Sequence, residues 1–297
     1  MPFGLKCASQ TFQRALDKIL TPVSDFAESY IDDVCCHNTG SFDEHLDCLR
    51  QVFTVIRNSG LTLKLSKCNF CKPKIKFVGH VIGQGVLEAN PEKLRALLEL
   101  PPPTTKKKVR SVLAMFRYYS THIPNFSQIA LPLVEITKKK QCNTFVLNDI
   151  QLSAFENLKH AIENCCKLYA PCYDKPFVIH TDASEHTIAA CLSQFDSKGN
   201  DCPIAFSSKK LSDSERKWSV IEKEAYAIIY ALKQYDYFIF GNTVELYTDH
   251  NPLTYIVDCT PKSAKLTRWC LGMQRWNVTI KYKNTKANVV ADCLSRV

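Results

Sequence analysis

Residues 177–182 have the sequence FVIHTD, a strand-like apolar run that leads to a carboxylate at Asp182. Two more strand-like segments follow, joined by the turn-rich stretch DSKGND at 196–201, and a long amphipathic helix comes next. The predicted strands are 177–182, 188–194, 203–208, 244–248 and 279–282, and the predicted helices are about 214–237, one through Trp269 and one from about Asn288. Three antiparallel strands, a helix and further strand and helix units predict a mixed α/β sheet.

The chain as a whole has the composition of a folded protein. Its 297 residues suggest about two domains, and 45% hydrophobic and 23% charged residues are ordinary values. The most apolar long run, 225–240, contains Lys233 and Asp236 and is too polar to cross a bilayer. The first six residues lack the basic start and apolar centre of a signal peptide. We therefore expect a cytoplasmic protein with no membrane partner.

Fifteen cysteines raise the question of disulfides or a zinc site. Without a secretory signal, the disulfide interpretation is weak. The CxxC at 68–71 has no second pair at zinc-ribbon spacing. Most of the cysteines are interpreted as small buried hydrophobic residues, and no structural zinc is expected.

The net charge of +9 has two interpretations, a soluble surface with surplus lysine or a polyanionic partner. Lysine runs at 106–108 and 138–140 favour the second, because clustered cations release counterions from a phosphate backbone. Prolines 101–103 and the polar stretch at about 137–149 break the pattern of helices and strands. Both breaks are predicted to separate subdomains.

Four acidic residues of the C-terminal half occupy positions where the predicted sheet could bring them together. Asp182 ends the first strand, Asp249 follows a later strand, and Asp292 lies in the last helix. Glu224 shares a face of the long helix with apolar residues at i−4, i+3 and i+4, so it is predicted to point at the sheet. Glu222, about 200° away around the helix, is predicted to face elsewhere.

Each of these carboxylates also has an ordinary interpretation. Asp249 could cap a helix, Asp182 could be a turn residue, and Asp292 could lie on the surface. Glu224 could be half-exposed. A cluster of carboxylates repels itself unless cations neutralise it, and oxygen-rich sites suit Mg²⁺. Two such ions about 4 Å apart can activate a water and stabilise the leaving oxygen in phosphodiester hydrolysis.

The sequence YIDD at 30–33 is the second candidate site. Paired aspartates at a tight turn between strands, here Asp32 and Asp33, hold the ions that polymerases use for nucleotidyl transfer. Taken alone, this tetrapeptide is more often an ordinary acidic turn. The motifs on either side of it decide between a polymerase site and an ordinary acidic turn.

Five motifs of the C-terminal half together resemble the ribonuclease H domain of Gypsy-class LTR retrotransposons. They are TDAS at 181–184, PIAFSSKKLS at 203–212, EKEA at 222–225, YTDHNPL at 247–253 and ADCLSR at 291–296. The resemblance implies that Asp182, Glu224, Asp249 and Asp292 form a catalytic tetrad that binds two Mg²⁺ ions, with Mn²⁺ as an alternative. It also implies an RNA–DNA hybrid as the partner and cleavage of the RNA strand as the reaction.

The N-terminal half resembles the reverse transcriptase of the same class. The motifs are FGLK at 3–6, TFQ at 11–13, YIDD at 30–33, KCNF at 67–70, FVGH at 77–80 and IPNF at 123–126. The implied fold is α/β (α+β): a truncated palm at 1–90, a thumb at 91–140, a connection or tether at 141–175 and a ribonuclease H-like mixed-sheet domain at 176–297.

This resemblance also assigns candidate residues in the polymerase part. Asp32 and Asp33 are the implied catalytic, metal-binding pair. The implied contacts to primer–template nucleic acid are Tyr30 and the primer-gripping hairpin residues Phe77, Val78, Gly79 and His80. The thumb residues Lys106, Lys107 and Lys108 depart from the family pattern and oppose the dipole of their helix, so they are interpreted as phosphate contacts, with neutral surface drift as the alternative. Lys108 stands where a capping box after Thr105 would have a glutamate.

The chain also departs from the family pattern at a palm carboxylate and at several glycines. The family's third palm carboxylate lies upstream of the FGLK segment, so we expect this chain alone not to polymerise DNA. Thr187, Ala189 and Thr285 replace glycines usual in the family, and lost glycines can strain turns that need positive φ.

The leading hypothesis is a retrotransposon Pol fragment with ribonuclease H activity and an incomplete RNA-directed DNA polymerase module. The alternative is a decayed or domesticated copy that binds nucleic acid without catalysis, and a pure interaction scaffold is third. The expected location is the cytoplasm, in the virus-like particle for the parent element, with the nucleus as the alternative. The sequence does not indicate an oligomeric state.

Overall fold

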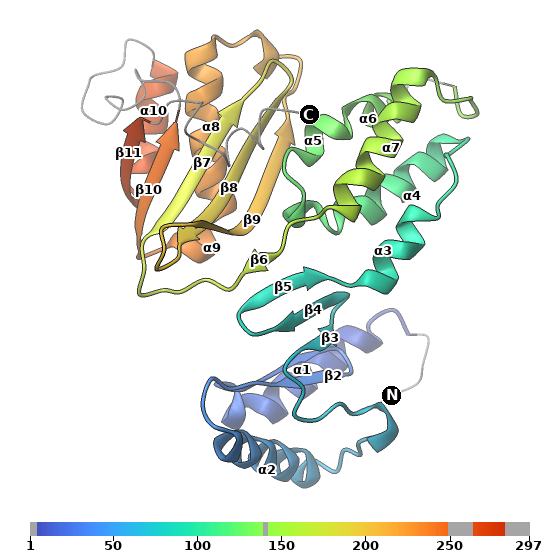
Figure 1. Ribbon diagram of the computed structural model, residues 1–297, viewed down its shortest axis with the longest axis vertical. Helices are drawn as coiled ribbons and strands as arrows, with labels where there is room; N and C mark the ends of the chain where they lie inside the picture. The colour runs from blue at the N-terminus through green and yellow to red at the C-terminus, as the bar shows by residue number, and fades with distance from the viewer. Residues whose placement is uncertain (1–4, 139–141, 249–263, 283–297) are drawn as a thin grey trace. The chain divides into compact units, whose positions relative to one another are not determined.

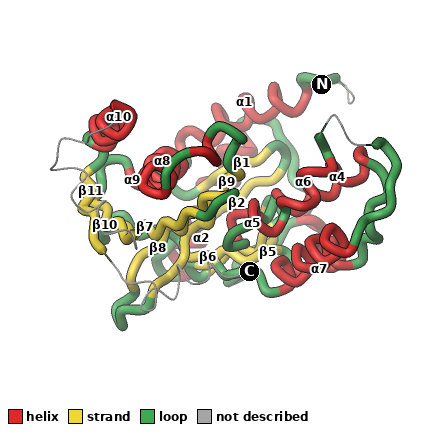
Figure 2. The backbone as a smooth tube through the Cα atoms, turned by 90° about the horizontal axis from the view of Figure 1, so that it is seen from above, coloured by secondary structure: helices red, strands yellow, loops and turns green. Residues whose placement is uncertain are grey.

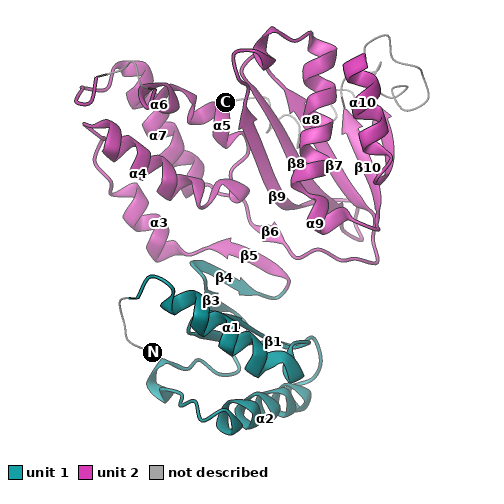
Figure 3. Ribbon diagram, turned by 180° about the vertical axis from the view of Figure 1, so that it is seen from behind, with its two compact units in different colours: residues 1–84 teal, residues 85–297 magenta. Residues whose placement is uncertain are grey.

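The computed structural model of the protein describes residues 5–138, 142–248 and 264–282. The chain forms two compact units, residues 1–84 and residues 85–297 (Figure 3). The predicted end of the palm at residue 90 lies near this division, and the predicted thumb, tether and ribonuclease H segments all fall in the second unit. The boundaries at 140 and 175 stay predictions.

The first unit packs two helices against a β-hairpin. Its elements are α1 (Ala8–Leu20), the short 3-10 helix η1 (Thr21–Val23), β1 (Ala27–Tyr30), β2 (Asp33–Cys36), α2 (Phe42–Asn58), the 3-10 helix η2 (Leu65–Lys67), β3 (Ile75–Phe77) and β4 (His80–Gly83). α2 begins with a capping box in which Ser41 Oγ accepts from the Glu44 amide and the Glu44 carboxylate accepts from the Ser41 amide. The small core joins α1, α2 and β1 through Leu16, Leu20, Val23, Ala27, Val52 and Ile56.

The second unit begins with a helical part. Its elements are β5 (Val86–Ala89), α3 (Pro91–Leu98), α4 (Lys106–Arg117), the 3-10 helix η3 (Ser120–His122), α5 (Phe126–Ile129), α6 (Leu131–Ile136), α7 (Asp149–Glu163) and β6 (Leu168–Tyr169). Helices α3 to α7 share one buried core, in which the rings of Phe116 and Phe155 meet edge to face at 6.4 Å. The predicted tether, 141–175, therefore contributes helix α7 to the same core as the predicted thumb.

A five-stranded sheet with the order β11-β10-β7-β8-β9 forms the rest of the second unit (Figure 1). Its elements are β7 (Phe177–Ala183), β8 (Thr187–Phe195), β9 (Asp201–Lys210), the 3-10 helix η4 (Glu215–Lys217), α8 (Val220–Gln234), α9 (Asp236–Ile239), β10 (Thr243–Thr248), α10 (Ala264–Met273) and β11 (Asn277–Tyr282). β10 is parallel to β7 and β11, whereas β7, β8 and β9 are antiparallel neighbours. The predicted mixed sheet is confirmed. The helix predicted from about 214 begins instead at Val220, because Ser219 caps it.

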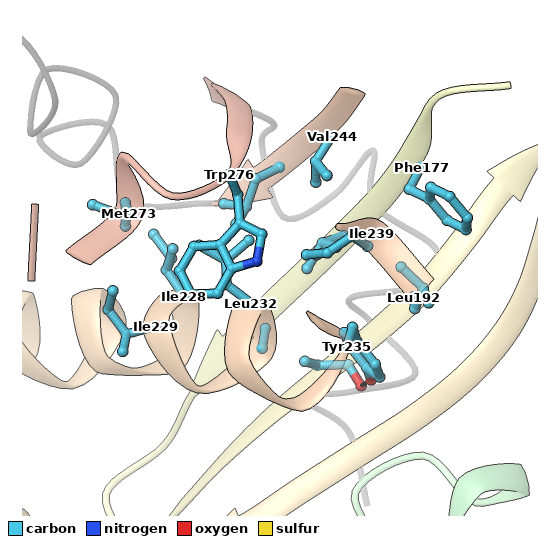
Figure 4. Packing of buried hydrophobic residues seen from close by; sticks show 14 of the residues in the cluster. Phe177, Leu192, Ile228, Ile229, Leu232, Tyr235, Ile239, Val244, Met273 and Trp276 are labelled. Carbon is cyan, nitrogen blue, oxygen red and sulfur yellow. Dashed lines mark hydrogen bonds between the residues drawn. The ribbon is translucent and has the colours of Figure 1, made fainter. Parts of the chain in front are cut away.

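Helices α8 and α10 lie on the same face of this sheet (Figure 2). The core between them is apolar and includes Phe177 and Ile179 of β7, Ile228 and Leu232 of α8, and Trp276 after α10 (Figure 4). Strand residues at alternate positions and helix residues at i and i+4 supply this core, which is the pattern that the sequence predicts.

One polar group lies inside this core. Tyr235, at the C-terminal end of α8, is 2% exposed, and its hydroxyl donates to the carbonyls of Ala190 at 2.9 Å and Ala205 at 3.1 Å. Burial raises the pKa of Tyr235 well above its ordinary value, so the hydroxyl stays a proton donor. It ties α8 to the backbones of β8 and β9.

The helical part also covers the edge strand β9. The Ser127 amide donates to Ser208 Oγ at 2.8 Å, and Ser127 Oγ donates to the Ser208 carbonyl at 2.9 Å. Leu168 of β6 packs against Ala189, Cys191 and Phe206 of the sheet. Among the described residues, no helix combines the length and the apolar content that a membrane span requires.

Candidate active site

Strand β7 and helix α8 carry Asp182 and Glu224 to the same end of the sheet. Asp182 lies opposite Ala189 near the C-terminal end of β7. The next residue, Ala183, packs in the same apolar cluster as Ala227, which lies one turn after Glu224. This packing aligns the end of β7 with the second turn of α8.

Glu224 is buried, at 5% exposure, on the sheet-facing side of α8. The prediction that it points at the sheet is confirmed. Glu222 faces elsewhere, as predicted: its carboxylate accepts from the Ser219 amide and pairs with Lys265 at 3.3 Å. These hydrogen bonds lower the pKa of Glu222. Burying the Glu224 carboxylate is costly unless a cation or donor compensates it, so its position indicates a specific site.

The other two predicted tetrad residues, Asp249 and Asp292, lie outside the described residues. β10 ends at Thr248, and it runs parallel beside β7 with Tyr247 opposite His180. Across 5–138, 142–248 and 264–282, no three His, Cys, Asp or Glu side chains are grouped as a metal site. Asp182 and Glu224 alone cannot make such a group, so their role as metal ligands stays a prediction.

The turn between β7 and β8 holds Asp182 without the family's usual glycines. Ser184 Oγ accepts from the Thr187 amide at 3.0 Å, and the Ser184 amide donates to the Thr187 carbonyl at 2.8 Å. Neither Thr187 nor Ala189 has a positive φ. The expected strain is therefore absent at these two positions, whereas Thr285 lies outside the described residues.

His180, two residues before Asp182, forms a buried polar pair with Asp201 that the sequence did not predict. His180, fully buried in β7, bonds through Nε2 to the Asp201 carboxylate at 2.7 Å and stacks on Tyr247 with ring centroids 5.5 Å apart. Because 21 residues separate His180 from Asp201, only the β7-β8-β9 pairing brings them together.

Of the predicted polymerase aspartates, Asp32 lies in the β1–β2 turn of the first unit and Asp33 begins β2. Tyr30 pairs with Asp33 across the hairpin, and Asp32 and Asp33 are both exposed. Ile31 has φ 55°, a conformation that a β-branched residue rarely adopts. Gln13 of α1 braces the turn, because its Oε1 accepts from the Ile31 amide at 2.5 Å.

Gln13 also holds the strand that leads into this turn. Its Nε2 donates to the carbonyl of Ser29 at 3.1 Å and to Asp17 Oδ1 at 2.7 Å. Gln13 belongs to the TFQ motif that carried the resemblance, but its distance in sequence from the aspartates gave no indication of this contact.

The FVGH segment is the tight turn between β3 and β4. Phe77 pairs with His80, and the two residues between them have positive φ, 44° at Val78 and 72° at Gly79. Positive φ at both central residues is the backbone pattern of a type I′ hairpin turn. The four residues are half-buried, and their contact with a primer stays a prediction.

Only two of the three predicted thumb lysines are exposed. Thr105 caps α4 by accepting from the Lys108 amide at 3.2 Å, and Lys107 and Lys108 lie on the surface. Lys106 is 9% exposed, and residues 143–144 return beside the start of α4, where the Lys106 amide donates to the Asn143 carbonyl at 3.0 Å and Thr105 forms a bridge with Thr144. Lys107 and Lys108 are therefore the better candidates for phosphate contacts.

Known families match nearly all of the first unit and about half of the second. The family described as "Reverse transcriptase (RNA-dependent DNA polymerase)" matches residues 1–82, and "RNase H-like domain found in reverse transcriptase" matches residues 172–276. The chain carries the reverse transcriptase and RNase H-like domains of a retrotransposon Pol polyprotein. The resemblance predicted from the sequence motifs is thereby confirmed.

Relatives from insects and yeast match along the whole chain. The chain is 38% identical over 299 residues to the retrovirus-related Pol polyprotein from transposon 297 of Drosophila melanogaster, and 36% identical over 308 residues to that from transposon opus. It is 30% identical over 303 residues to the transposon Tf2-3 polyprotein of Schizosaccharomyces pombe. All three alignments cover 100% of this chain but only 28%, 30% and 22% of the respective polyproteins.

Solved structures share the fold of the reverse transcriptase and RNase H-like domains. The foamy viral protease-reverse transcriptase in complex with dsDNA aligns over 96% of this chain and 60% of its own, with a TM-score of 0.82 and 22% identity. The same viral protein in complex with an RNA/DNA hybrid aligns over 96% of this chain and 39% of its own, with a TM-score of 0.78 and 22% identity. The predicted fold class is confirmed.

Proposed function

We propose that the RNase H-like domain of this chain is an endonuclease that cuts the RNA strand of an RNA–DNA hybrid. The observation that carries the proposal is the buried carboxylate of Glu224, aligned with the Asp182 end of β7. The motifs add Asp249 and Asp292 to the same site. The hybrid is the proposed substrate because it is the ligand named for a relative of the same fold.

Carboxylate oxygens at one end of a sheet suit Mg²⁺, with Mn²⁺ as an alternative. Asp182 and Glu224, with Asp249 and Asp292, would hold two ions, which would activate a water and stabilise the leaving oxygen of the cleaved phosphodiester. The chain's own contribution is to fix the two described carboxylates. The Ser184–Thr187 turn holds the end of β7, and the Ser219 cap sets the first turn of α8.

A cleavage assay with a labelled hybrid and Mg²⁺ tests this proposal. Asp182→Asn and Glu224→Gln should each lower cleavage at least about 100-fold, because losing a metal ligand removes several kcal/mol of transition-state stabilisation. The matched control is Asp174→Asn, an exposed carboxylate just before β7, which should cleave like the unmodified chain. Equal activity in Asp182→Asn and Asp174→Asn would rule the proposal out.

The same assay separates the second candidate function, a decayed or domesticated copy that binds nucleic acid without catalysis. Hybrid binding by the unmodified chain with no cleavage in Mg²⁺ or Mn²⁺ would favour that candidate. The observation in its favour is the surplus of positive charge, +9 overall, with Lys107 and Lys108 exposed on α4.

For the reverse transcriptase domain we propose that Asp32 and Asp33 are metal ligands and that the 297 residues alone do not polymerise DNA. The turn presents both carboxylates to solvent, where they can reach ions, but the family's third carboxylate comes from an upstream strand. A primer-extension assay with the purified chain checks this. Metal-dependent synthesis that Asp32→Asn abolishes would show that two carboxylates suffice.

A further inference from the structure

A cavity of about 670 Å³ lies in the second unit, between the helical part and the RNase H-like sheet. Its walls come from the end of α4 and η3, from α5 and α6, from β9, and from α8 and α9. The volume is in the range of small-molecule sites. Neither Asp182 nor Glu224 lines it, so the cavity is separate from the carboxylate site.

The polar part of the wall is cationic. Its charged lining residues are Arg117, Lys209 and Lys210, and no carboxylate lines the cavity. Glu215 accepts from Lys209 at 2.9 Å, and Lys210 pairs with Glu135. Both lysines therefore have a counter-charge already.

Arg117 differs from the two lysines. Its side chain is exposed, and across the described residues its guanidinium makes no hydrogen bond or ion pair. Tyr230 also lines the cavity, and burial raises the pKa of its hydroxyl. Tyr230 shares a hydrogen bond of 2.6 Å with Ser207. One uncompensated cation and two hydroxyls thus line the same cavity.

The remaining wall is apolar. Phe206, Phe238, Ala205 and Val134 line it. The half-buried ring of Phe238 offers a surface for a planar group, whereas Phe206 is 5% exposed and packs against Leu168. A bare phosphate would use the cation and the hydroxyls but leave this apolar space unfilled. The wall therefore fits an anion that carries a flat, partly apolar group.

We propose that this cavity binds a phosphate group carried by a nucleoside, with Arg117 paired to the phosphate and the base against the apolar wall. Guanidinium groups bind phosphate oxygens in bidentate geometry, and Tyr230 or Ser207 can donate a further hydrogen bond. The nucleotide has two sources, a free mononucleotide or the phosphorylated end of a bound strand.

Calorimetric titration of the purified chain in EDTA tests the site without the metal-dependent carboxylates. The probes are deoxyadenosine monophosphate, deoxyadenosine, inorganic phosphate and a 5′-phosphorylated oligonucleotide. The monophosphate should bind more tightly than deoxyadenosine or phosphate. Arg117→Gln should weaken it at least about tenfold, because a charge-assisted hydrogen bond is lost. Tyr230→Phe should weaken it less.

The matched control is Arg95→Gln, which removes an exposed arginine of helix α3 that does not line the cavity. It should bind the monophosphate like the unmodified chain. If Arg117→Gln weakens the binding of the oligonucleotide but not that of the monophosphate, the ligand is a strand end. No saturable binding of the monophosphate or the oligonucleotide, or equal binding in Arg117→Gln and Arg95→Gln, would overturn the proposal. Thermal unfolding of both variants verifies that they fold.

Discussion

Replacing Tyr235 with phenylalanine tests the one buried hydroxyl that ties α8 to two strands. The substitution keeps the ring in the core and removes the donor shared by the Ala190 and Ala205 carbonyls. A buried acceptor left without its donor costs about 1–3 kcal/mol, so we expect the free energy of unfolding to fall by roughly 2 kcal/mol.

Urea unfolding followed by tryptophan fluorescence measures this change. The chain has three tryptophans, Trp218, Trp269 and Trp276, and all three belong to the RNase H-like domain, so the signal reports on that domain. With a urea dependence of about 1–3 kcal/mol per molar, the midpoint should fall by roughly 0.7–2 M.

Tyr237→Phe is the matched control, because Tyr237 is two residues away and 88% exposed. It should change the free energy of unfolding by less than about 0.5 kcal/mol. If Tyr235→Phe and Tyr237→Phe had equal midpoints, the hydroxyl of Tyr235 would not connect the helix to the sheet, and the reasoning would be refuted.

Two further predictions concern the first unit and the pH dependence of the second. Gln13→Ala should speed hydrogen exchange of the Ile31 amide about tenfold or more, because that amide loses its acceptor. The control Gln10→Ala, at an exposed position of the same helix, should leave the exchange rate unchanged. Equal exchange rates in the two variants, measured by NMR, would contradict the hydrogen bond between Gln13 and Ile31. Burial raises the pKa of Glu215, but hydrogen bonds from the Ser212 amide and the Lys209 ammonium outweigh this effect and lower the pKa to about 2. The ionised Glu215 therefore stabilises the fold fully above about pH 4.5, and this stabilisation is lost as the pH falls toward 2. Glu215→Gln should lower the free energy of unfolding by roughly 2–3 kcal/mol at pH 7 and by much less near pH 2. If urea titrations showed that Glu215→Gln lowers the free energy of unfolding equally at pH 7 and pH 2, the predicted pH dependence would be wrong.

The sheet and the direction of Glu224 were predictable because they depend on local periodicity. β7 and β8 each contain a short continuous apolar run, which is typical of a strand buried on both faces, and Glu224 shares its helix face with Ile228 and Ala231. Both patterns are visible within a window of one element. The resemblance supplied the candidate roles of Asp32, Asp33 and Asp182, which periodicity alone could not assign.

Contacts between distant segments were not predictable in the same way. The His180–Asp201 pair, the brace from Gln13 and the cavity beside Arg117 all depend on which elements are neighbours. The burial of Lys106 has the same origin, because residue 143 returns to pair with the start of α4. A lysine run indicates charge, but a single sequence does not show which of its members the returning chain covers.

The hydrogen bonds between Ser127 and Ser208 have a practical consequence for dissecting this protein. β9 is the last strand of its sheet, and an uncovered edge strand can pair with a strand of another molecule and start aggregation. A fragment that began at residue 172, where the RNase H-like match begins, would lose Ser127 from that edge and Leu168 from the apolar patch at Phe206. We expect such a fragment to precipitate at concentrations where residues 85–297 remain in solution, so soluble expression of this domain should include the helices that precede it.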